Sequence, residues 1–532
     1  MYFNEKILVG KNDEKEAYIL PNMANRHGII SGASGSGKTI TLKVLAESFS
    51  DARVPVFLVD VKGDLAGTAL NGVMNSNIEE RIEKLKLENF ELKKYPTTFW
   101  DVYGEYGHPI RTTVKNVGPK LLSKMLDLSE AQEGVLTIAF KIAEDENLDL
   151  IDLKDLRSLL NYIGEKRKDY SLNYGNITTQ SVGSIQRNIL SLQEEGGDYF
   201  FGMPDFEIKD FIHYDGDTGK GQINILHAST LFQKPNLYST FLLWLLTHIY
   251  NNMPEVGDLP KPKLVFFIDE AHLLFDNIPR TLLTSITQIV KLIRSKGVGL
   301  YFISQSPSDV PDEILSQLGN RIQHVLRYYT KNDEKSIKAA ANSFRINPKL
   351  DTVEEIKNLG TGVALVSFQD EKGMPQMVEK VTILPPQSAM GAIEDDVRQE
   401  LIRRSYLYGK YENKIDDISA HEKIASVKEE ELKNKQEEEE KKKKELEEKE
   451  AEKKRKEEEK RIKEEEREAE KKRKEEERKK KEEEREAEKK RKEEEKARKN
   501  NPGYKLGKKV VNKATNKVID KSLNKILKGL FK

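Results

Sequence analysis

Eight consecutive residues near the start of the chain have the types and spacing that hold a phosphate group. Residues 32–39 read Gly-Ala-Ser-Gly-Ser-Gly-Lys-Thr and fit the pattern G-x-x-x-x-G-K-[ST]. Glycines at these positions let backbone N–H groups turn inward around a phosphate, where a Cβ would clash. Lys38 suits the β- and γ-phosphate oxygens, and the Thr39 hydroxyl suits Mg²⁺. The expected nucleotide-binding residues are Gly32, Ala33, Ser34, Gly35, Ser36, Gly37, Lys38, Thr39, Thr41 and Asp60.

The residues around this loop favour the same interpretation. An apolar run at 28–31 precedes it, and residues 39–46 read as a helix, so strand, loop and helix follow in the required order. The start of that helix adds the positive end of its dipole to the site. An ordinary Gly/Ser-rich surface loop is the alternative interpretation.

Two carboxylates much farther along the chain supply the other half of such a site. Asp269 and Glu270 directly follow the apolar run 264–268. An apolar strand that ends in two acids places both at the carboxyl edge of a parallel sheet, beside the loop. We expect Asp269 to hold Mg²⁺ through water and Glu270 to act as the general base. Lys38 and Glu270 are therefore predicted to be catalytic.

Two further strand ends carry polar side chains. Asp60 and Lys62 follow the run 56–59, and they would lie near the loop if that strand neighbours the loop's strand. Gln305 follows the run 300–304, where an amide suits sensing of a γ-phosphate or orientation of water, and is a further catalytic candidate. An ordinary turn or cap is the alternative for each.

The elements that position these residues read as an α/β domain. Continuous rather than alternating apolarity is typical of a parallel sheet covered on both faces. A helical stretch at 281–295 carries apolar residues on one side. We expect a doubly wound, mostly parallel sheet. Its predicted strands are 28–31, 56–59, 223–226, 264–268, 300–303 and 362–366.

Composition constrains the class of protein. The chain has 532 residues, no cysteine, and 90 basic against 90 acidic side chains. Disulfides and thiolate metal sites are excluded, which favours a reducing compartment. The start of the chain is interrupted by charge and lacks a signal-peptide pattern. No apolar stretch approaches the length of a bilayer span, so we expect a cytoplasmic protein.

Helical patterns dominate between residues 70 and 220. The clearest segments are 119–128, 130–144, 152–165 and 178–195. We therefore expect residues 1–72 and 221–395 to form the nucleotide-binding core and residues 73–220 a mostly helical insertion. Residues 396–426 are expected to be a linker, which leads into the charged tail.

Residues 427–500 are almost wholly Glu, Lys and Arg, and they repeat. The sequence Ala-Glu-Lys-Lys-Arg-Lys-Glu-Glu-Glu begins at Ala451, Ala469 and Ala487, a spacing of 18 residues. Eighteen residues make about five α-helical turns, so each repeat returns to one face. Apolar residues are too sparse for a coiled-coil seam, and opposite charges three to four apart favour a solvated single helix. Disorder is the alternative.

The last segment, 501–532, changes character. Between 517 and 532, lysines occupy one helical face and aliphatic residues the opposite one. A basic amphipathic helix binds an anionic membrane surface or the groove of a protein partner. Packing onto the chain's own core or a sister subunit is the equally weighted alternative.

Longer stretches resemble the HerA/FtsK class of P-loop ATPases, which are hexameric DNA-pumping motors with a RecA-like core. More specifically, the chain is similar to bacterial HerA-like C-terminal-domain ATPases. The resemblance implies ATP, Mg²⁺, possible DNA substrates, and a homo-oligomeric ring in which one subunit completes its neighbour's site. The resembling stretches lie between about residues 10 and 390 and include 98–104, 174–177, 263–275, 292–299 and 317–321.

The same resemblance yields two arginine-finger candidates. Arg321 follows Gly319-Asn320, as in the class motif, and Arg294 is the second candidate. A guanidinium fork matches the phosphate oxygens of the transition state. We favour Arg321. The sequence departs from HerA in two respects: the loop begins too early to leave room for HerA's N-terminal β-barrel, and the charged tail is added.

Three hypotheses for function follow. The first is an ATP-hydrolysing motor that acts on DNA. The second is an ATP-controlled scaffold, with the charged helix as spacer and the terminal helix as anchor. The third is a pump for proteins or peptides, as in related secretion ATPases.

Overall fold

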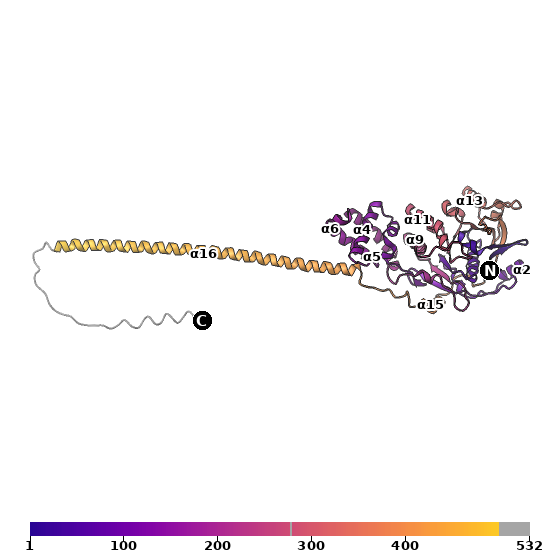
Figure 1. Cartoon of the computed structure of the whole chain (residues 1–532), viewed down its shortest axis with the longest axis horizontal. Coiled ribbons are helices and arrows are strands. Elements are labelled where there is room, and N and C mark those ends of the chain that lie inside the picture. The colour runs from indigo at the N-terminus through magenta and orange to yellow at the C-terminus, as the bar shows by residue number, and fades with distance from the viewer. Residues whose placement is uncertain (277–278, 499–532) are drawn as a thin grey trace. The chain divides into compact units, whose positions relative to one another are not determined.

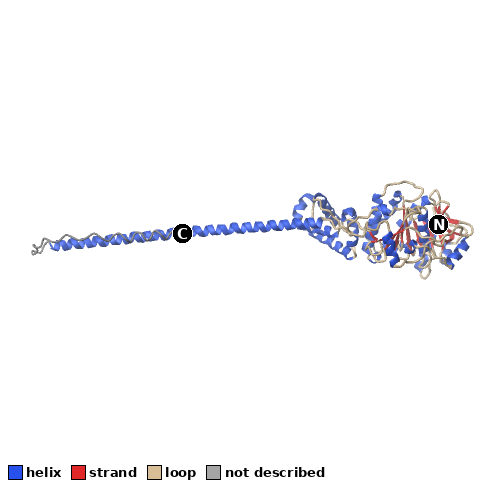
Figure 2. Cartoon of the chain, turned by 90° about the horizontal axis from the view of Figure 1, so that it is seen from below, coloured by secondary structure: helices blue, strands red, loops and turns tan. Residues whose placement is uncertain are grey.

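A computed structural model of the chain describes residues 1–276 and 279–498 (Figure 1). The chain divides into two units, Met1–Glu430 and Glu431–Lys532. The first unit contains one large sheet with helices around it, as Figure 2 shows, and the second contains most of a long charged helix. The candidate site residues all belong to the first unit.

The sheet runs in the order β1–β2–β13–β12–β11–β4–β10–β9–β5–β8–β6–β7, and β3 pairs with β2. Neighbouring strands are parallel from β11 to β7 and antiparallel from β11 to β1. The expected mostly parallel α/β sheet is confirmed. The strands are β1 (Tyr2–Phe3), β2 (Lys6–Lys11), β3 (Glu16–Ile19), β4 (Gly28–Ser31), β5 (Val56–Asp60), β6 (Thr97–Asp101), β7 (His108–Pro109), β8 (Ile223–His227), β9 (Leu264–Ile268), β10 (Val298–Ser304), β11 (Asn320–Gln323), β12 (Val363–Ser367) and β13 (Glu379–Ile383).

The predicted strand at 362–366 runs antiparallel to its neighbours, which its apolar composition did not indicate. The run 362–366 forms β12, which is antiparallel to both β11 and β13. An antiparallel pair can be joined by a short loop, whereas a parallel pair needs a crossover connection. Residues 368–378 make the short connection from β12 to β13, so this margin of the sheet needs no crossover helix.

The sheet is buried on both faces because successive side chains of a strand point to opposite sides. Phe57 and Val59 of β5 join a core with α9 (Pro235–Asn252) and α11 (Arg280–Leu292). Val56 and Leu58 join a second core with α1 (Lys38–Asp51). All five residues of β5 are buried, which explains its unbroken apolarity. The sheet therefore forms the middle layer and holds its strand ends in fixed positions.

Residues 73–220, where we expected a mostly helical insertion, supply both helices and strands. The expected helices occur as α3 (Val114–Met125), α4 (Glu130–Asp145), α5 (Leu153–Glu165) and α7 (Thr179–Glu194). α3 bends at Gly118, which has φ of +73° directly before Pro119. Two strands of this segment, β6 and β7, extend the central sheet beyond β8. The segment therefore contributes strands to the central sheet in addition to its helices.

Apart from α16, the remaining α-helices have between 4 and 12 residues. None of the helices in the described residues combines the length and the apolar composition that crossing a bilayer requires. The remaining α-helices are α2 (Ser76–Leu85), α6 (Arg167–Tyr174), α8 (Gly197–Phe200), α10 (His272–Phe275), α12 (Asp312–Leu315), α13 (Lys331–Asn342), α14 (Thr352–Asn358) and α15 (Asp395–Arg404).

Residues 396–426, for which the sequence predicts a linker, contain packed side chains. Tyr411 is fully buried, and its hydroxyl donates to the Asp210 carboxylate. Farther along, the backbone N–H of His421 donates to Asp155 Oδ1 at 2.9 Å. Four residues of the segment also belong to the main core, namely Leu407, Tyr411, Ala420 and Ile424.

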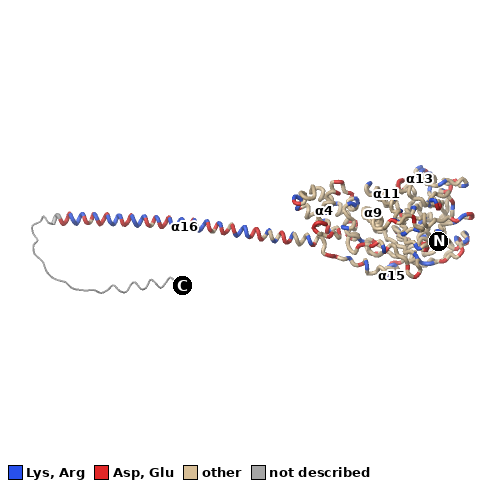
Figure 3. The backbone as a smooth tube through the Cα atoms, viewed as in Figure 1, with Lys and Arg blue, Asp and Glu red and all other residues tan. Residues whose placement is uncertain are grey.

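The charged tail is helical. α16 spans Ala420–Arg498, and basic residues alternate with glutamates along its backbone (Figure 3). The same ion pair recurs in each repeat: Lys456–Glu452 at 2.8 Å, Lys474–Glu470 at 2.8 Å and Lys492–Glu488 at 3.2 Å. These pairs join residues four apart, the spacing that stabilises a solvated helix. The amphipathic helix predicted at 517–532 lies outside the described residues.

Candidate nucleotide-binding site

The glycine-rich loop joins β4 to α1 and is tied to both neighbouring strands. The Gly32 N–H donates to the Ser304 carbonyl at the end of β10, at 3.3 Å. The Ala33 N–H donates to the Val325 carbonyl, just past β11, at 2.8 Å. β10 and β11 are the two parallel neighbours of β4. The start of the loop is therefore held at the carboxyl edge of the sheet.

Two loop positions require glycine. Gly32 has φ of +153°, and a Cβ there would lie 2.5 Å from His324 Cβ. Gly37 has φ of +111°, and a Cβ there would lie 3.1 Å from Gly362 N and Cα. L-residues with a side chain rarely adopt such positive φ values. The loop is thus shaped by its own backbone and by the segments packed beneath it.

Lys38 curls back over the loop. Its Nζ donates to the Gly32 carbonyl at 2.6 Å and to the Ala33 carbonyl at 3.1 Å. Burial lowers the pKa of Lys38, whereas the charges of Glu270 and Asp269 act in the opposite direction. The loop's lysine and the acid pair therefore lie close enough to interact electrostatically.

The acid pair lies at the end of β9, and only β10 separates that strand from β4. The Ala271 N–H donates to the Ile303 carbonyl at 2.7 Å, which fixes the turn after the acids. Burial, followed by the charge of Glu270, raises the pKa of Asp269 to about 7. The predicted convergence of Lys38 with Asp269 and Glu270 at one sheet edge is thus present in the geometry.

Buried polar atoms at this edge suit a metal–phosphate ligand. Asp269 Oδ2 and Ser36 Oγ are buried and have no hydrogen-bond partner among the described residues. Buried polar atoms normally have partners, so such atoms need an explanation. Carboxylate and hydroxyl oxygens are ligands for Mg²⁺, and a hydroxyl also donates to phosphate. The residues present therefore fit Mg²⁺ with a nucleotide phosphate.

Glu270 is held in an unusual conformation. Its φ is +46°, which is uncommon for a residue with a side chain. Its carboxylate forms an ion pair with the Lys62 ammonium, and His272 Nδ1 lies 3.3 Å from Oε2. Burial acts to raise the pKa of Glu270, but Lys62, His272 and Lys38 outweigh it and hold the pKa below its ordinary value. Glu270 is therefore ionised and restrained.

The strand before Lys62, β5, does not lie next to β4, the strand that leads into the loop. We expected Asp60 and Lys62 near the loop if β5 neighboured β4, but β9 and β10 lie between them. Lys62 reaches the site through Glu270 instead. The Asp60 carboxylate accepts the Gly63 N–H at 2.7 Å and the Leu65 N–H at 3.1 Å, within its own turn. Direct nucleotide contact by Asp60 stays a prediction.

Gln305 and Thr41 differ in exposure: the first is exposed and the second is buried. Gln305 is exposed directly after β10, between the strands that carry the loop and the acids. Thr41 is fully buried, and its hydroxyl lies 2.8 Å from His324 Nε2 and 3.1 Å from the Gly37 carbonyl. Thr41 therefore supports the loop from below rather than facing a ligand.

Both arginine-finger candidates lie away from their own loop. Arg321 is the second residue of β11, in register with Ile29, and donates to the Leu318 and Leu315 carbonyls at 3.1 Å each. Arg294 precedes β10, at the strand end opposite Gln305, and lies 3.7 Å from Asp258 Oδ1. The chain brings neither guanidinium to its own Lys38.

His324 and Tyr238 escaped the sequence argument. His324 follows β11 and packs under the loop, where burial lowers its pKa to about 4. Tyr238 lies on α9; its hydroxyl is buried without a partner among the described residues, and burial together with Asp269 and Glu270 raises its pKa. His324 directly follows β11, a strand that the sequence argument did not predict, so no signal marked it. Nothing in the sequence around Tyr238 marked it.

Comparison with known proteins gives consistent matches. The family model described as Helicase HerA-like C-terminal matches residues 5–530. The chain is 25% identical over 383 residues to the DNA double-strand break repair helicase HerA of Sulfurisphaera tokodaii, covering 68% of this chain and 66% of the relative. It is 25% identical over 367 residues to HerA of Saccharolobus solfataricus, covering 68% and 64%. The chain thus spans just under two thirds of these relatives.

Solved structures give a weaker likeness. The bacterial conjugative coupling protein TrwB superposes with a TM-score of 0.46 at 15% identity, covering 70% of this chain and 88% of that one. VirB4 of Thermoanaerobacter pseudethanolicus gives a TM-score of 0.45 at 15% identity, covering 72% and 97%. A further TrwB structure, described as a complex with ADP and Mg²⁺, gives a TM-score of 0.43 at 15% identity, covering 69% and 88%.

Proposed function

This chain belongs to the helicase HerA-like C-terminal family, and on that premise we propose that it is an ATPase motor. It binds ATP with Mg²⁺, hydrolyses it and moves DNA as a ring of identical subunits, hexameric by family resemblance. One observation supports this most directly. Lys38 and the Asp269–Glu270 pair follow β4 and β9 at the same edge of the sheet, and only β10 lies between these two strands.

Each residue at that edge has a role in the proposal. The loop backbone and Lys38 hold the phosphates, while Thr39 and Asp269 hold Mg²⁺. When bound, this ion neutralises the charge that develops on the transferred phosphoryl group. Glu270 accepts a proton from the attacking water, and Gln305 orients that water. The low pKa of Glu270 keeps it in the ionised form that this role needs.

The positions of the two candidate arginines support the ring in this proposal. Arg321, our first choice, and Arg294 both lie away from their own Lys38, so a finger from either acts on a neighbouring subunit. The names of the relatives, which describe DNA double-strand break repair helicases, support the proposed DNA role. Contacts to DNA phosphates by pore-facing basic residues would make the activity salt-dependent.

ATPase assays with and without single- and double-stranded DNA test this proposal. We expect DNA to raise the turnover of the wild-type chain. Lys38→Ala and Glu270→Gln are expected to lower it by about 100-fold or more. Glu371→Gln, at an exposed position in the turn between β12 and β13, serves as the matched control and should change turnover less than about twofold.

Each part of the proposal has its own contrary outcome. Turnover that ignores both forms of DNA rejects the DNA role, and wild-type protein that does not hydrolyse ATP rejects the ATPase. Native mass measurements of Glu270→Gln with ATP test the ring. A monomer at all protein concentrations would reject it.

A further inference from the structure

Two adjacent tyrosines and an arginine are exposed shortly after β11, between that strand and α13. Tyr329 is 82% exposed and Tyr328 is 52% exposed, and Arg327 directly before them is exposed as well. Tyrosine and arginine are among the residue types that most often anchor a bound partner. A run of three such side chains at the surface therefore indicates a contact surface.

Hydrogen bonds restrain the backbone of this exposed segment. The Asp333 carboxylate accepts the Tyr329 N–H at 3.0 Å and the Thr330 N–H at 2.7 Å. In return, the Thr330 hydroxyl accepts the Asp333 N–H at 3.2 Å. The Lys357 ammonium lies 6.0 Å from the centre of the Tyr328 ring. A restrained segment loses less conformational entropy when a partner binds, so the tyrosines are well placed to make contacts.

The surroundings of the tyrosines carry unpaired positive charge. The side chains of Arg327, Lys331 and Lys335 are exposed and form no hydrogen bond or ion pair with any residue that the structure describes. Lys331 and Lys335 are four residues apart on α13, so they share a face of the helix.

The acids of α13 and α14 do not offset this charge, because all four are already engaged. Asp333 holds the backbone of the exposed segment, as described above. The other three form ion pairs, namely Glu334–Lys338 at 2.8 Å, Glu354–Lys357 at 2.7 Å and Glu355–Lys380 at 2.7 Å. The charge that remains for a partner is therefore positive.

We propose that Arg327, Tyr328, Tyr329, Lys331 and Lys335, the 327–335 surface, bind single-stranded DNA. The inference rests on the proposed function and adds the residues that contact the strand and the form of DNA that they select. The faces of unpaired bases are open, so tyrosine rings stack on them, whereas a duplex keeps those faces covered. The three cations suit the phosphates of the same strand.

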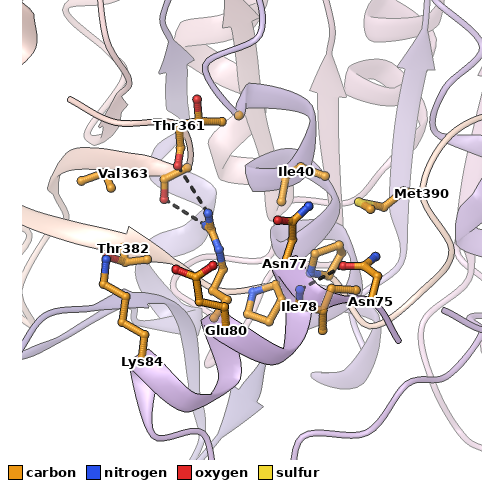
Figure 4. A pocket seen from close by; sticks show the side chains of 15 residues that line it. Ile40, Asn75, Asn77, Ile78, Glu80, Lys84, Thr361, Val363, Thr382 and Met390 are labelled. Carbon is orange, nitrogen blue, oxygen red and sulfur yellow. Dashed lines mark hydrogen bonds between the residues drawn. The ribbon is translucent and has the colours of Figure 1, made fainter. Parts of the chain in front are cut away.

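The lobe that carries this surface also holds the phosphate-binding loop at two points. The Val325 carbonyl, just before the surface, accepts the Ala33 N–H at 2.8 Å. The Gly362 N–H, on the turn after α14, donates to the Ser36 carbonyl at 2.9 Å. Figure 4 shows this turn from close by, with Thr361 labelled. Because α13 and α14 pack together, a strand on the 327–335 surface contacts the same lobe that positions the loop.

Fluorescence anisotropy on the full chain distinguishes base stacking from phosphate contact. The probes are a labelled oligo-dT strand of about 20 nucleotides and the same strand paired with its complement. We expect Tyr328→Ala and Tyr329→Ala each to weaken strand binding by about fivefold or more, because each removes a stacking partner. Duplex binding should change less than about twofold. Tyr329→Trp keeps an aromatic face and should retain strand binding.

Three further measurements complete the design. Tyr408→Ala removes a tyrosine that is 54% exposed and lies outside the 327–335 surface, and it should leave both affinities unchanged. Lys331→Gln and Lys335→Gln should each reduce the steepness of log K against log salt concentration for the strand by about 0.7. Photocrosslinking with 5-iododeoxyuridine in the strand gives an independent readout, with label expected on Tyr328 or Tyr329.

The contrary results are distinct. If wild type binds the strand and both alanine variants bind it equally well, the inference is overturned although the proposed function stands. Equal weakening of strand and duplex binding also overturns it, because the tyrosines would then not stack on open bases. If wild-type protein binds neither probe, the proposed DNA role fails and the inference fails with it.

Discussion

The Lys62 ammonium pairs with the Glu270 carboxylate across the ends of two neighbouring strands, β5 and β9. Lys62 is half-exposed, whereas Glu270 is buried. A carboxylate that is paired with an ammonium group is a weaker proton acceptor than a free one. The general base of the proposed reaction is therefore restrained by a side chain that solvent can reach.

Replacing Lys62 by methionine is expected to raise ATP turnover in the absence of DNA by about threefold to tenfold, because Glu270 becomes a stronger base. Steady-state kcat measures the effect. Lys141→Met removes a comparably exposed lysine from its ion pairs with Glu144 and Asp145 on α4, and it should leave kcat unchanged. A fall in kcat would instead mean that Lys62 orients the carboxylate.

Arg321→Ala is expected to lower kcat by about 100-fold or more while nucleotide affinity changes little, since a finger acts on the transition state. Arg294→Ala should lower kcat less than about fivefold, because its partner Asp258 is exposed and such pairs contribute little. Comparing kcat with the nucleotide Kd for each variant distinguishes the two arginines.

Mixing experiments test whether the finger acts between subunits. A Lys38→Ala subunit keeps Arg321, and an Arg321→Ala subunit keeps an intact loop. Mixed rings should regain part of the activity that each variant lacks alone. Since Arg321 also holds the Leu315 and Leu318 carbonyls, thermal unfolding must first show that the variant is folded. Activity absent from folded mixtures would contradict a finger in trans.

His324 makes the stability of the loop region depend on pH. Burial lowers its pKa to about 4, and its Nδ1 lies 3.2 Å from the Val363 carbonyl. A carbonyl only accepts, so Nδ1 carries the hydrogen of the neutral ring and donates it to the Val363 carbonyl. The unfolded chain binds a proton at about pH 6.5, well above the folded pKa. The contribution of His324 is therefore complete above about pH 6.5 and is lost as the pH falls toward 4.

Thermal unfolding of wild type and His324→Gln between pH 7.5 and 4.5 checks this dependence. The difference in stability should be largest at pH 7.5 and shrink by on the order of 2 kcal/mol as the pH falls. Asp60, whose pKa burial raises to about 6, acts in the opposite sense but is present in both proteins. His213→Asn, a histidine stacked on Tyr406, controls for loss of a histidine. A difference that stays constant with pH would contradict the assignment.

The charged tail should behave as an isolated helix. A fragment of residues 431–498 is expected to be helical by circular dichroism and to lose ellipticity as NaCl rises toward about 1 M, because its exposed ion pairs are screened. Sedimentation should give the mass of a monomer, since the apolar residues form no seam. A mass that rises with concentration would show that the tail associates.

The sequence predicted the two halves of the candidate site because each is a local pattern. The loop at 32–39 and the acids after 264–268 are defined by residues next to one another, and the sheet brings them together as parallel strand ends. The helix at 281–295 was also predictable, because its apolar residues fall on one side, and α11 spans Arg280–Leu292. Local rules sufficed wherever the determining neighbours are close in the chain.

What the sequence could not give depends on strand order. Lys62 reaches Glu270 only because β5 lies next to β9, and His324 reaches Thr41 only because β11 lies next to β4. β6 escaped the prediction because it is a short strand between helical segments. The packing of Tyr411 was missed because its hydrogen-bond partner, Asp210, is 201 positions away in the chain, so no local pattern marks the contact.

The end of β10 links the two halves through consecutive residues. The Ser304 carbonyl holds the Gly32 N–H, and the Ile303 carbonyl holds the Ala271 N–H. The phosphate-binding loop and the turn that carries the acids are thus both hydrogen-bonded to the same short stretch of backbone. Rigid-body motion of a subunit within an assembly leaves the distance between the loop and the acid turn unchanged. Such motion can therefore affect catalysis only by moving groups of a neighbouring molecule toward or away from the site.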